Sequence, residues 1–287
     1  MILRQQPTST RQYTGTSTLT GPITVTTISP SGTAPGTVIV ETPPPLPTFD
    51  CDEGGYLIQN RALYRLNLET GENVLVRNPV GPGGNINGIG YNILDDLIWG
   101  MYADTSNFRV IRIGPDGSST FIDATLPRPD SSVTGGTTWN AGDVDPDGNF
   151  WVASNGRQWA RIDANPASST FGTVLQQGTS TAENPVVDWT YVPGGGRYLY
   201  GLAYTSTRTR LARWSLDTFT WEIVRDYGNI VGSNLWGANY AVGNGIFYAS
   251  ENSSGDIYRF DINSGAPVKV TAGPSSSNND GARCFNA

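Results

Sequence analysis

The sequence predicts an all-β protein organised as a five-bladed β-propeller, and three observations carry this prediction. One short pattern recurs five times: an apolar residue, one spacer, an arginine, an apolar residue and a small or polar residue. The arginines of successive copies are 47, 49, 52 and 46 residues apart, a spacing typical of a repeat architecture. The strand that the first unit lacks is supplied by the last residues of the chain. The five arginines are Arg65, Arg112, Arg161, Arg213 and Arg259.

The composition agrees with many short strands joined by turns. The 287 residues include 35 glycines and 19 prolines, and no window shows a sustained 3.6-residue period, so almost no helix is expected. All-β folds often exceed 200 residues as one domain. Residues 48–287 are therefore assigned to the propeller, with six blades as the alternative to five.

Charge and residue usage exclude several classes of function. A formal net charge of −7 argues against a nucleic-acid binder and against an anionic membrane as partner. No apolar run is long enough to span a bilayer, and the first six residues lack the apolar core of a signal peptide. The chain has no histidine, which removes the commonest general base and the commonest metal ligand.

Residues 1–47 have a different composition and are assigned to a separate segment. Residues 7–48 hold 13 threonines and 4 serines, with only Arg11 and Glu41 charged. Strand-prone stretches at 23–28 and 37–42 precede a stiff polyproline spacer at 43–47. The segment is interpreted as an O-glycosylated stalk, with a disordered linker as the alternative. The candidate glycan acceptors are Thr14, Thr16, Thr18, Thr24, Thr26 and Thr37.

A third interpretation makes the same segment a strand donor. Residues 20–42 would pair with a sheet edge of a neighbouring copy, which would build an extracellular fibre by self-association. The residues Tyr13–Ser17 followed by Thr37–Pro43 also resemble the Thr-rich tandem repeat of fungal flocculin-type cell-wall adhesins. This resemblance covers about 30 residues, one repeat's worth, and implies a cell-wall location.

Each repeat unit is expected to contain four strands. In the second unit they are 86–91, 97–102, 108–113 and 119–122; the third, fourth and fifth units span 139–176, 186–225 and 236–271. The second strands share an aromatic residue followed closely by a small one. The first strands share a narrow or polar position, which suits strands crowded at a common axis; these positions are Gly88, Gly142, Asp188 and Gly237.

The end of the chain is expected to complete the first blade. Residues 279–285 match the missing inner strand, with Gly281 in the position of Gly88, so the ring closes without a free sheet edge. Cys51 and Cys284 then meet at one hairpin. A disulfide there would contribute roughly 5 kcal/mol by the chain-entropy estimate and would indicate an extracytoplasmic protein. Two independent buried thiols are the alternative.

The repeat region resembles an uncharacterised β-propeller family found in secreted fungal and bacterial proteins. The residues that carry the resemblance are Gly55–Gln59, Leu63–Leu68 with the Thr70-Gly71 turn, and Asn87–Asn92. The resemblance implies the fold and secretion, and it brings no established activity with it.

One acidic stretch has the spacing of a calcium loop. Asp143, Asp145 and Asp147 alternate and Gly148 is the sixth residue, but Ser154 stands where the closing bidentate Glu should be. An Asp-Gly turn between two strands has the same sequence pattern, and we favour this turn over a calcium-binding loop. We therefore expect no cofactor, with calcium as the alternative.

The inner strands direct further polar and aromatic side chains toward the axis or its mouth. Such groups suit carbohydrate recognition. The alternative is that they form hydrogen bonds with one another and with ordered water, without a ligand. A lactonase-like, calcium-dependent hydrolase or lyase is the enzymatic alternative, but carboxylates would have to act without histidine. The candidate ligand-binding residues are Asn87, Asp143, Asp188, Trp139, Trp189, Trp236, Asn239 and Arg283, and Asp280 accompanies them.

Other tryptophans and one sequon complete the candidates. Trp99, Trp151 and Trp214 occupy repeat-core positions and are expected to be buried, whereas Trp221 is freer. Asn252 begins an Asn-Ser-Ser sequon and is a candidate for an N-glycan.

These observations predict a secreted or cell-surface, non-enzymatic protein. Its propeller head would serve adhesion or recognition of carbohydrate or protein, with glycans or surface proteins as partners, on an O-glycosylated stalk. A structural fibre subunit is the alternative. The five arginines are read as scaffold, each laying its stem over a neighbouring blade and bonding a turn or carboxylate. A local function is expected where the repeat is broken.

Overall fold

A computed structural model describes residues 23–26, 37–40 and 45–287, and the chain divides into two units, Met1–Pro45 and Leu46–Ala287. In the first unit, β1 (Ile23–Thr26) pairs antiparallel with β2 (Thr37–Val40), with Ile23 opposite Val40. Both predicted strand-prone stretches thus contain a strand. Of the candidate glycan acceptors, Thr24, Thr26 and Thr37 lie on these strands, and Thr14, Thr16 and Thr18 lie outside the described residues.

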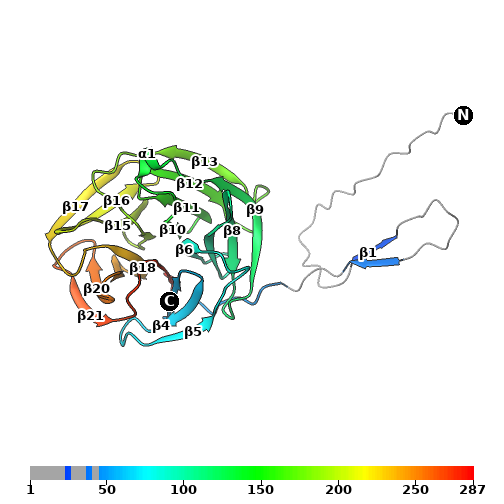
Figure 1. Ribbon diagram of the computed structural model, residues 1–287, viewed down its shortest axis with the longest axis horizontal. Helices are drawn as coiled ribbons and strands as arrows, with labels where there is room; N and C mark the ends of the chain where they lie inside the picture. Colours follow the sequence, from blue (N-terminus) through cyan, green and yellow to red (C-terminus); the bar gives the residue numbers. More distant parts are fainter. Residues whose placement is uncertain (1–22, 27–36, 41–44) are drawn as a thin grey trace, which may run out of the picture. The chain divides into compact units, whose positions relative to one another are not determined.

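The second unit consists of five four-stranded antiparallel sheets arranged around one axis (Figure 1). Blade 1 contains β22 (Asn279–Ala282), β3 (Gly55–Gln59), β4 (Ala62–Leu66) and β5 (Asn73–Arg77), from the axis outward. Blade 2 contains β6 (Ile86–Asn92), β7 (Leu97–Ala103), β8 (Asn107–Ile113) and β9 (Ser119–Pro127). Blade 3 contains β10 (Ala141–Val144), β11 (Asn149–Ser154), β12 (Gln158–Asp163) and β13 (Val174–Thr179).

Blades 4 and 5 follow the same order. Blade 4 contains β14 (Trp189–Tyr191), β15 (Tyr198–Thr205), β16 (Arg208–Ser215) and β17 (Trp221–Gly228). Blade 5 contains β18 (Trp236–Gly243), β19 (Ile246–Glu251), β20 (Asp256–Asp261) and β21 (Val268–Ala272). The described residues contain one short helix, α1 (Ser131–Thr134), capped by Asp130 and Gly135. The prediction of a five-bladed, almost helix-free propeller is confirmed.

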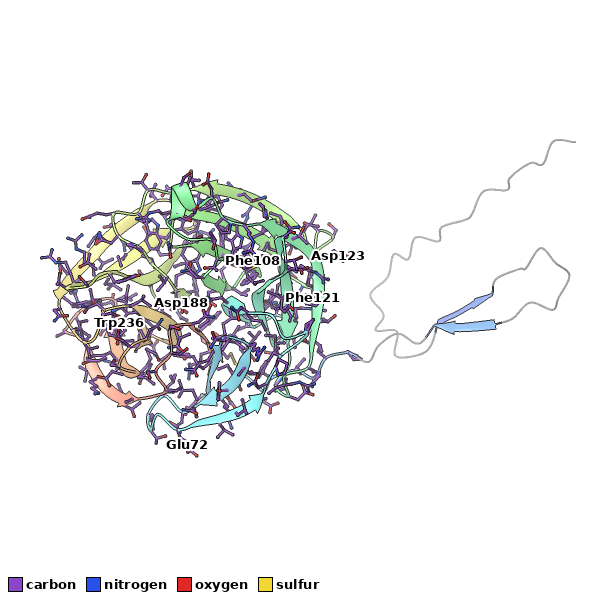
Figure 2. All side chains as sticks on the ribbon, in the orientation of Figure 1. Glu72, Phe108, Phe121, Asp123, Asp188 and Trp236 are labelled. Carbon is purple, nitrogen blue, oxygen red and sulfur yellow. A yellow bond between two sulfur atoms is a disulfide. The ribbon has the colours of Figure 1, made fainter. Side chains whose placement is uncertain are left out.

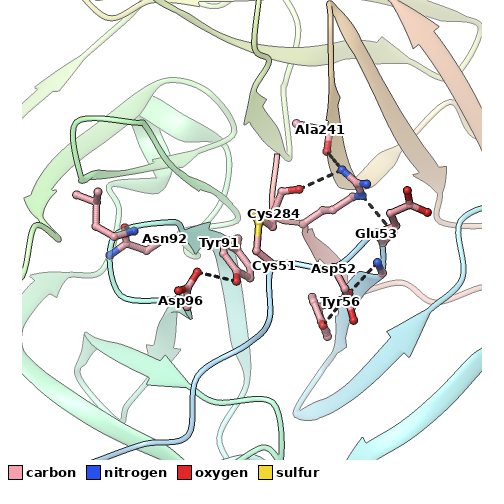
Figure 3. Close-up of a disulfide and its surroundings, with 12 residues drawn as sticks. Cys51, Asp52, Glu53, Tyr56, Tyr91, Asn92, Asp96, Ala241 and Cys284 are labelled. Carbon is pink, nitrogen blue, oxygen red and sulfur yellow. Dashed lines mark hydrogen bonds between the residues drawn. A yellow bond between two sulfur atoms is a disulfide. The ribbon is translucent and has the colours of Figure 1, made fainter. Parts of the chain in front are cut away.

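The ring closes through blade 1, as the sequence predicts. The C-terminal strand β22 pairs antiparallel with β3, and Gly281 lies opposite Leu57. Beside this junction Cys51 and Cys284 form a disulfide that joins residues 233 apart, with their Cα atoms 5.2 Å from each other (Figure 3). The first and last strands of the propeller are therefore held together by both a hydrogen-bonded ladder and a covalent bond.

The recurring arginines lie on the third strand of each blade, opposite an aromatic residue of the second strand. Arg161 faces Trp151, and its guanidinium carbon lies 5.4 Å from the centre of that ring, within cation–π range. The other pairs are Tyr56 with Arg65, Trp99 with Arg112, Tyr200 with Arg213, and Tyr248 with Arg259. The repeated arginine therefore belongs to a cross-strand arginine–aromatic pair that recurs in every blade.

Two of these arginines pair with carboxylates of their own blade. Arg112 pairs with Asp95 at 3.6 Å, and Asp95 belongs to the turn between β6 and β7 of the same blade. Arg213 pairs with Glu222 of β17 at 2.7 Å, again within its own blade. The expected carboxylate partners are therefore present, and they come from the arginine's own blade. Arg112 also lies over the ring of Phe171 in blade 3, at 5.5 Å from its centroid.

Crowding at the axis explains the narrow residues of the inner strands. A Cβ atom on Gly142 would overlap the backbone of Gly88 in the adjacent blade, and one on Gly90 would overlap the backbone of Asp143. Gly88 also has a positive φ of 56°, at an irregularity in the pairing of β6 with β7. Glycine is required here because two backbones approach each other without room for a side chain.

Aromatic residues fill the space between blades. Trp99, Trp151 and Trp214 are at most 1% exposed, which confirms their predicted place in the core. Between blades 3 and 4 the indole rings of Trp151 and Trp214 meet edge to face, with centroids 5.3 Å apart. Such interlocked rings contribute both buried area and a preferred geometry, so they fix how neighbouring blades pack.

Removing the disulfide should weaken ring closure measurably. We expect the double variant Cys51→Ser/Cys284→Ser to lose about 2–5 kcal/mol of unfolding free energy, because the unfolded chain regains the entropy of a very long loop. Guanidinium denaturation, followed by tryptophan fluorescence, measures this loss. Dithiothreitol should lower the midpoint of the wild type and leave that of the variant unchanged; equal midpoints for wild type and variant would contradict the expectation.

Candidate functional site

Three aspartates on the inner strands of different blades are buried near the propeller axis. They are Asp143 on β10, Asp188 immediately before β14, and Asp280 on β22. Asp188 lies near the centre of the disc, whereas Glu72 lies at its edge (Figure 2). The predicted convergence of inner-strand carboxylates on the axis is therefore observed.

Two of these carboxylates bond the backbone of the next blade. Oδ2 of Asp143 accepts hydrogen bonds from the N–H of Tyr191 at 2.7 Å and from the hydroxyl of Thr190 at 2.8 Å. Oδ2 of Asp188 accepts the N–H of Asn239 at 2.6 Å. Asp143 thus joins blade 3 to blade 4, and Asp188 joins blade 4 to blade 5. These bonds hold consecutive inner strands in register around the axis.

Burial changes the acid–base behaviour of all three groups. Burial raises the pKa of Asp143 to about 7, although the hydrogen bonds that it accepts act in the opposite direction. Burial likewise holds the pKa of Asp188 well above its ordinary value, and the neighbouring carboxyl of Asp280 adds to this. Burial also raises the pKa of Asp280, although hydrogen bonds from the backbone N–H groups of Ile89, Gly88 and Gly281 act in the opposite direction, and Asp143 adds a smaller increase. The carboxyls therefore form one electrostatically connected set.

One residue of this region has side-chain atoms without hydrogen-bond partners among the described residues. Both amide atoms of Asn239 are in this position, and the residue is only 1% exposed. Buried polar atoms are rarely left unpaired in folded proteins. The axis therefore combines interblade bonding with unused bonding capacity.

The residues predicted at the mouth of the axis have other roles. Asn87 donates from Nδ2 to Oδ1 of Asn278 at 2.9 Å, in the connection that precedes β22. Arg283 is 6% exposed and donates to the backbone carbonyls of Glu53, Ala241 and Cys284, the last of these a disulfide residue. Both side chains therefore bind segments at the closure of the ring.

The acidic stretch with calcium-loop spacing forms a turn between β10 and β11. Asp145 accepts from the N–H groups of Asp147 and Asn149 and from Nε1 of Trp151, while the exposed Asp147 pairs with Arg197. Asp143 points to blade 4, as described above. The three carboxylates thus have three separate sets of partners. In the described part of the chain, no three His, Cys, Asp or Glu side chains converge into a metal-binding group.

The tryptophans predicted to stack on a ligand are buried instead. Trp139, Trp189 and Trp236 are at most 1% exposed. Their Nε1 atoms donate to the carbonyl of Pro127, the carbonyl of Trp151 and the hydroxyl of Thr209, respectively. The prediction was wrong for these three rings, because the inner ends of the blades pack against each other there and leave no face for a sugar.

The sequon residue is also enclosed. Asn252 is 7% exposed, and its Oδ1 accepts a hydrogen bond from Nδ2 of Asn279 on the inner strand of blade 1. An N-glycan would occupy the same amide group and would have to leave this packing. The N-glycan at Asn252 stays a prediction, and it would require this hydrogen bond to open.

A cleft that the sequence did not reveal lies between the outer parts of blades 3 and 4. It has a volume of about 550 Å³ and is lined by aromatic, hydroxyl and glycine residues, without a charged side chain. We call it the aromatic cleft. Its residues are Trp159, Gly178, Thr179, Ser180, Thr181, Thr218, Phe219, Thr220 and Trp221.

The wall of the aromatic cleft contains an unusual backbone. Phe219 has a φ of +58°, and its ring stacks on Trp159 with centroids 4.6 Å apart. Blade 1 has Gly71 at the corresponding turn position, with a φ of +76° and the same hydrogen bond to the residue four positions earlier. A bulky residue in this region of φ is strained, and such strain clusters at functional sites.

A second hollow lies beside the ring closure and has a volume of about 690 Å³. Its lining includes Asp52, Glu69, Glu72, Arg65 and Arg283. Asp52 pairs with Arg65 at 2.6 Å, and Arg283 is bonded to backbone carbonyls. The two arginines of this hollow therefore already have partners.

Comparison with known proteins gives a family without an assigned activity. Residues 56–286 match the family model described as "Repeat of unknown function (DUF6923)". None of the curated proteins matches this sequence. No helix of the described residues has the length and apolar character needed to cross a bilayer.

Three solved structures illustrate the distant structural similarities. A structural-genomics protein of unknown function from Bacteroides thetaiotaomicron aligns with 74% of this chain at 11% identity and a TM-score of 0.49; the chain spans only 56% of that protein. A functionally unknown protein from Desulfotomaculum acetoxidans aligns at 15% identity over 82% and 88% of the two chains, with a TM-score of 0.46. A chain of a nidogen/laminin complex aligns at 10% identity over 79% and 83%, with a TM-score of 0.45.

The raised pKa values predict a stability that depends on pH. A carboxyl whose pKa is higher in the folded than in the unfolded protein stabilises the fold at low pH, and this contribution is lost as the pH rises. Since the pKa of Asp143 is about 7 and that of Asp95 about 6, the unfolding free energy should fall between about pH 4 and pH 7. Asp188 and Asp280 act in the same direction.

Urea denaturation at pH 5 to 8, in EDTA to exclude metal ions, measures this slope. The variant Asp143→Asn should show a smaller fall over this range, whatever its absolute stability, because it has one fewer titrating group. Asp147→Asn, at an exposed turn position, serves as the matched control. A wild type that becomes more stable from pH 5 to pH 8 would refute the assignment of raised pKa values to the axis.

Proposed function

The chain belongs to the family described as "Repeat of unknown function (DUF6923)", and we propose that it is a non-enzymatic recognition protein whose aromatic cleft binds a neutral glycan. The observation that carries the proposal is Phe219, an aromatic residue held at positive φ where the corresponding turn of blade 1 has glycine. A repeat that is broken by a strained aromatic side chain, at the wall of a cleft, is best explained by a role in binding.

The chemistry of the aromatic cleft suits a sugar. The apolar faces of Phe219 and Trp221, both partly exposed, offer surfaces on which a pyranose ring can stack. The exposed hydroxyls of Thr179, Thr181 and Thr220 can exchange hydrogen bonds with sugar hydroxyls. The absence of a charged residue from this lining favours a neutral ligand over an acidic or basic one.

The non-enzymatic part of the proposal rests on the axial carboxyls and on composition. Asp143 and Asp188 are buried and bonded to the backbone of adjacent blades, where they serve the packing of the ring. The chain has no histidine to act as a general base. A carboxylate-based hydrolase would need acids that reach a substrate, and these two do not face solvent.

An extracellular setting is part of the same proposal. The disulfide between Cys51 and Cys284 is of the kind that persists in oxidising compartments. The Thr- and Pro-rich residues 1–47 would form an O-glycosylated stalk that carries the propeller, as segments of such composition do in surface proteins. Together these features describe an adhesion or recognition head displayed away from a surface.

The substitution Phe219→Gly tests the glycan site. It restores the residue type that blade 1 has at this position, so it relieves backbone strain while removing the stacking ring. We expect about tenfold or greater weakening of binding to neutral oligosaccharides, identified on an array and quantified by calorimetry, since tenfold corresponds to about 1.4 kcal/mol. Loss of the stack on Trp159 should lower the melting temperature, so binding is compared at a temperature at which tryptophan fluorescence shows both proteins folded.

The control is Ile223→Gly, at a 39% exposed position of β17 outside the aromatic cleft. It should leave glycan affinity unchanged. Equal affinities of the wild type and Phe219→Gly for every bound oligosaccharide, or an array without any bound neutral glycan, would exclude the aromatic cleft as a glycan site.

A second candidate function is that of a subunit in an extracellular fibre. It is favoured by the first unit, in which β1 and β2 form a sheet of only two strands, and no third strand pairs with them among its described residues. A lone two-stranded sheet is marginally stable in water and gains from a further strand. A neighbouring copy would supply a sheet edge, as in strand-addition assemblies.

Removal of residues 1–44 separates the two functions. If the segment is a strand donor, sedimentation velocity should detect oligomers of the full chain and only monomers of the shortened chain. Glycan affinity per propeller should be the same for both, because the aromatic cleft lies within blades 3 and 4. Monomers of both chains at high concentration would reject the fibre.

A further inference from the structure

We propose that β5, the outer strand of blade 1, accepts the β1–β2 sheet of a second copy of this chain. The proposal rests on the fibre function proposed above and adds the surface to which the N-terminal segment of the next copy binds. We call this surface the acceptor edge; it consists of residues 73–77, at the rim of the propeller (Figure 1).

Strand β5 is exposed on both of its faces. Val74 is 56% exposed and Leu75 is 53% exposed, and consecutive residues of a strand point to opposite faces of the sheet. The outer strand β9 of blade 2 differs, because its Ala124 and Leu126 are buried. Among the described strands, β5 alone has two large apolar residues exposed. The acceptor edge therefore presents apolar surface that no described residue covers.

The backbone of β5 also has an unpaired side. In blade 1, β5 pairs with β4, and no further strand lies beyond it among the described residues. Proteins commonly protect such edges with charged residues, as in β21, where Lys269 adjoins the exposed Val268. The centre of β5 is Val74-Leu75-Val76, without a charge. All five outer strands have irregular pairing, so β5 differs from the others in its apolar exposure.

The β1–β2 sheet has the properties of a strand donor. All eight residues of β1 and β2 are isoleucine, threonine or valine, which are favoured in strands. The two strands pair only with each other among the described residues. Each has four residues, against five in β5. Pairing with the acceptor edge would join a two-stranded sheet and a blade into one continuous sheet, which gives the donor the further strands it lacks.

Charge complementarity supports the same occupant. Residues 1–22, which precede β1, contain two arginines and no acidic residue. The hollow beside the ring closure is lined by the exposed Glu53, Glu69 and Glu72, and none of them forms an ion pair in the described part of the chain. Val74 of the acceptor edge lines this hollow too. Opposite charges would therefore guide the incoming segment to blade 1.

The connection between β2 and the propeller favours pairing between copies. Residues 43–47 contain four prolines, and proline-rich segments are extended and stiff. Such a spacer opposes a return of the β1–β2 sheet onto its own blade. Each copy would then offer one donor and one acceptor, a head-to-tail contact that continues from copy to copy and builds a filament.

Sedimentation velocity of the full chain over a range of concentrations tests the acceptor edge. Leu75→Lys should raise the concentration at which half of the chains are assembled by tenfold or more, because it places a charge on the pairing surface. Val74→Lys should act in the same direction from the opposite face of the strand. Both positions are more than half exposed, so circular dichroism should show both variants folded.

The matched control is Ile223→Lys, at a 39% exposed position on the outer strand of blade 4. It should assemble like the wild type. A chain without residues 1–44 has the acceptor edge but no donor, so its addition should shorten wild-type oligomers. The same shortened chain with Leu75→Lys should lose this effect.

Different results would overturn the fibre function and the acceptor edge. A wild type that stays monomeric at high concentration would reject both. A wild type that forms oligomers as readily as Leu75→Lys and Val74→Lys would leave the fibre function and place the acceptor surface elsewhere. Equal weakening by Ile223→Lys, or no shortening of oligomers by the chain without residues 1–44, would likewise exclude β5 as the acceptor.

Discussion

The structure depends on the closure of a ring whose first and last strands come from opposite ends of the propeller region. Each blade packs its two faces against two neighbours, so an open ring would expose one face of blade 1 and one of blade 5. The pairing of β22 with β3 and the Cys51–Cys284 disulfide remove that exposure. Arg283 reinforces the same junction by bonding backbone carbonyls of blade 1 and of blade 5.

Closure of five blades brings the inner strands very close together, and the chemistry of the axis follows from this crowding. Glycines such as Gly90 and Gly142 admit the neighbouring backbone. Where the inner strand has an aspartate instead, the carboxylate reaches the backbone N–H of the next blade, as Asp143 and Asp188 do. The axis is thus a bonded hub, and the exposed hollows lie away from it, in the outer parts of blades 3 and 4 and beside the closure.

Most of the fold could be predicted from the sequence because each blade repeats the same short sequence patterns, which can be recognised without knowledge of contacts between blades. The arginine spacing gave the number of blades, and the match of Gly281 to Gly88 gave the closure and the cysteine pairing. The turn at Asp145 was also predicted and is present, because Asp-Gly turns are local. The axial position of Asp143, Asp188 and Asp280 followed from their place on inner strands.

The site itself was less predictable because it depends on contacts between blades. The burial of Trp139, Trp189 and Trp236 is decided by the neighbouring blade, which a single strand does not reveal. Likewise, the stacking of Phe219 on Trp159 joins residues of two blades. The positive φ of Phe219 is indicated in the sequence only by a phenylalanine where the corresponding turn of blade 1 has glycine. Trp221 was the one predicted ring that lines the cleft.

The position of the disulfide has a mechanical consequence. The chain enters the propeller through the buried Phe49, whose N–H bonds the carbonyl of Asp96 in blade 2, and it reaches Cys51 two residues later, just before β3. The covalent bond passes tension at Cys51 to Cys284 at the end of the last strand, so β3 and β22 are pulled as one body and are not peeled apart one hydrogen bond at a time. A pull on the N-terminal side is therefore shared between the first and the last strand of the propeller region.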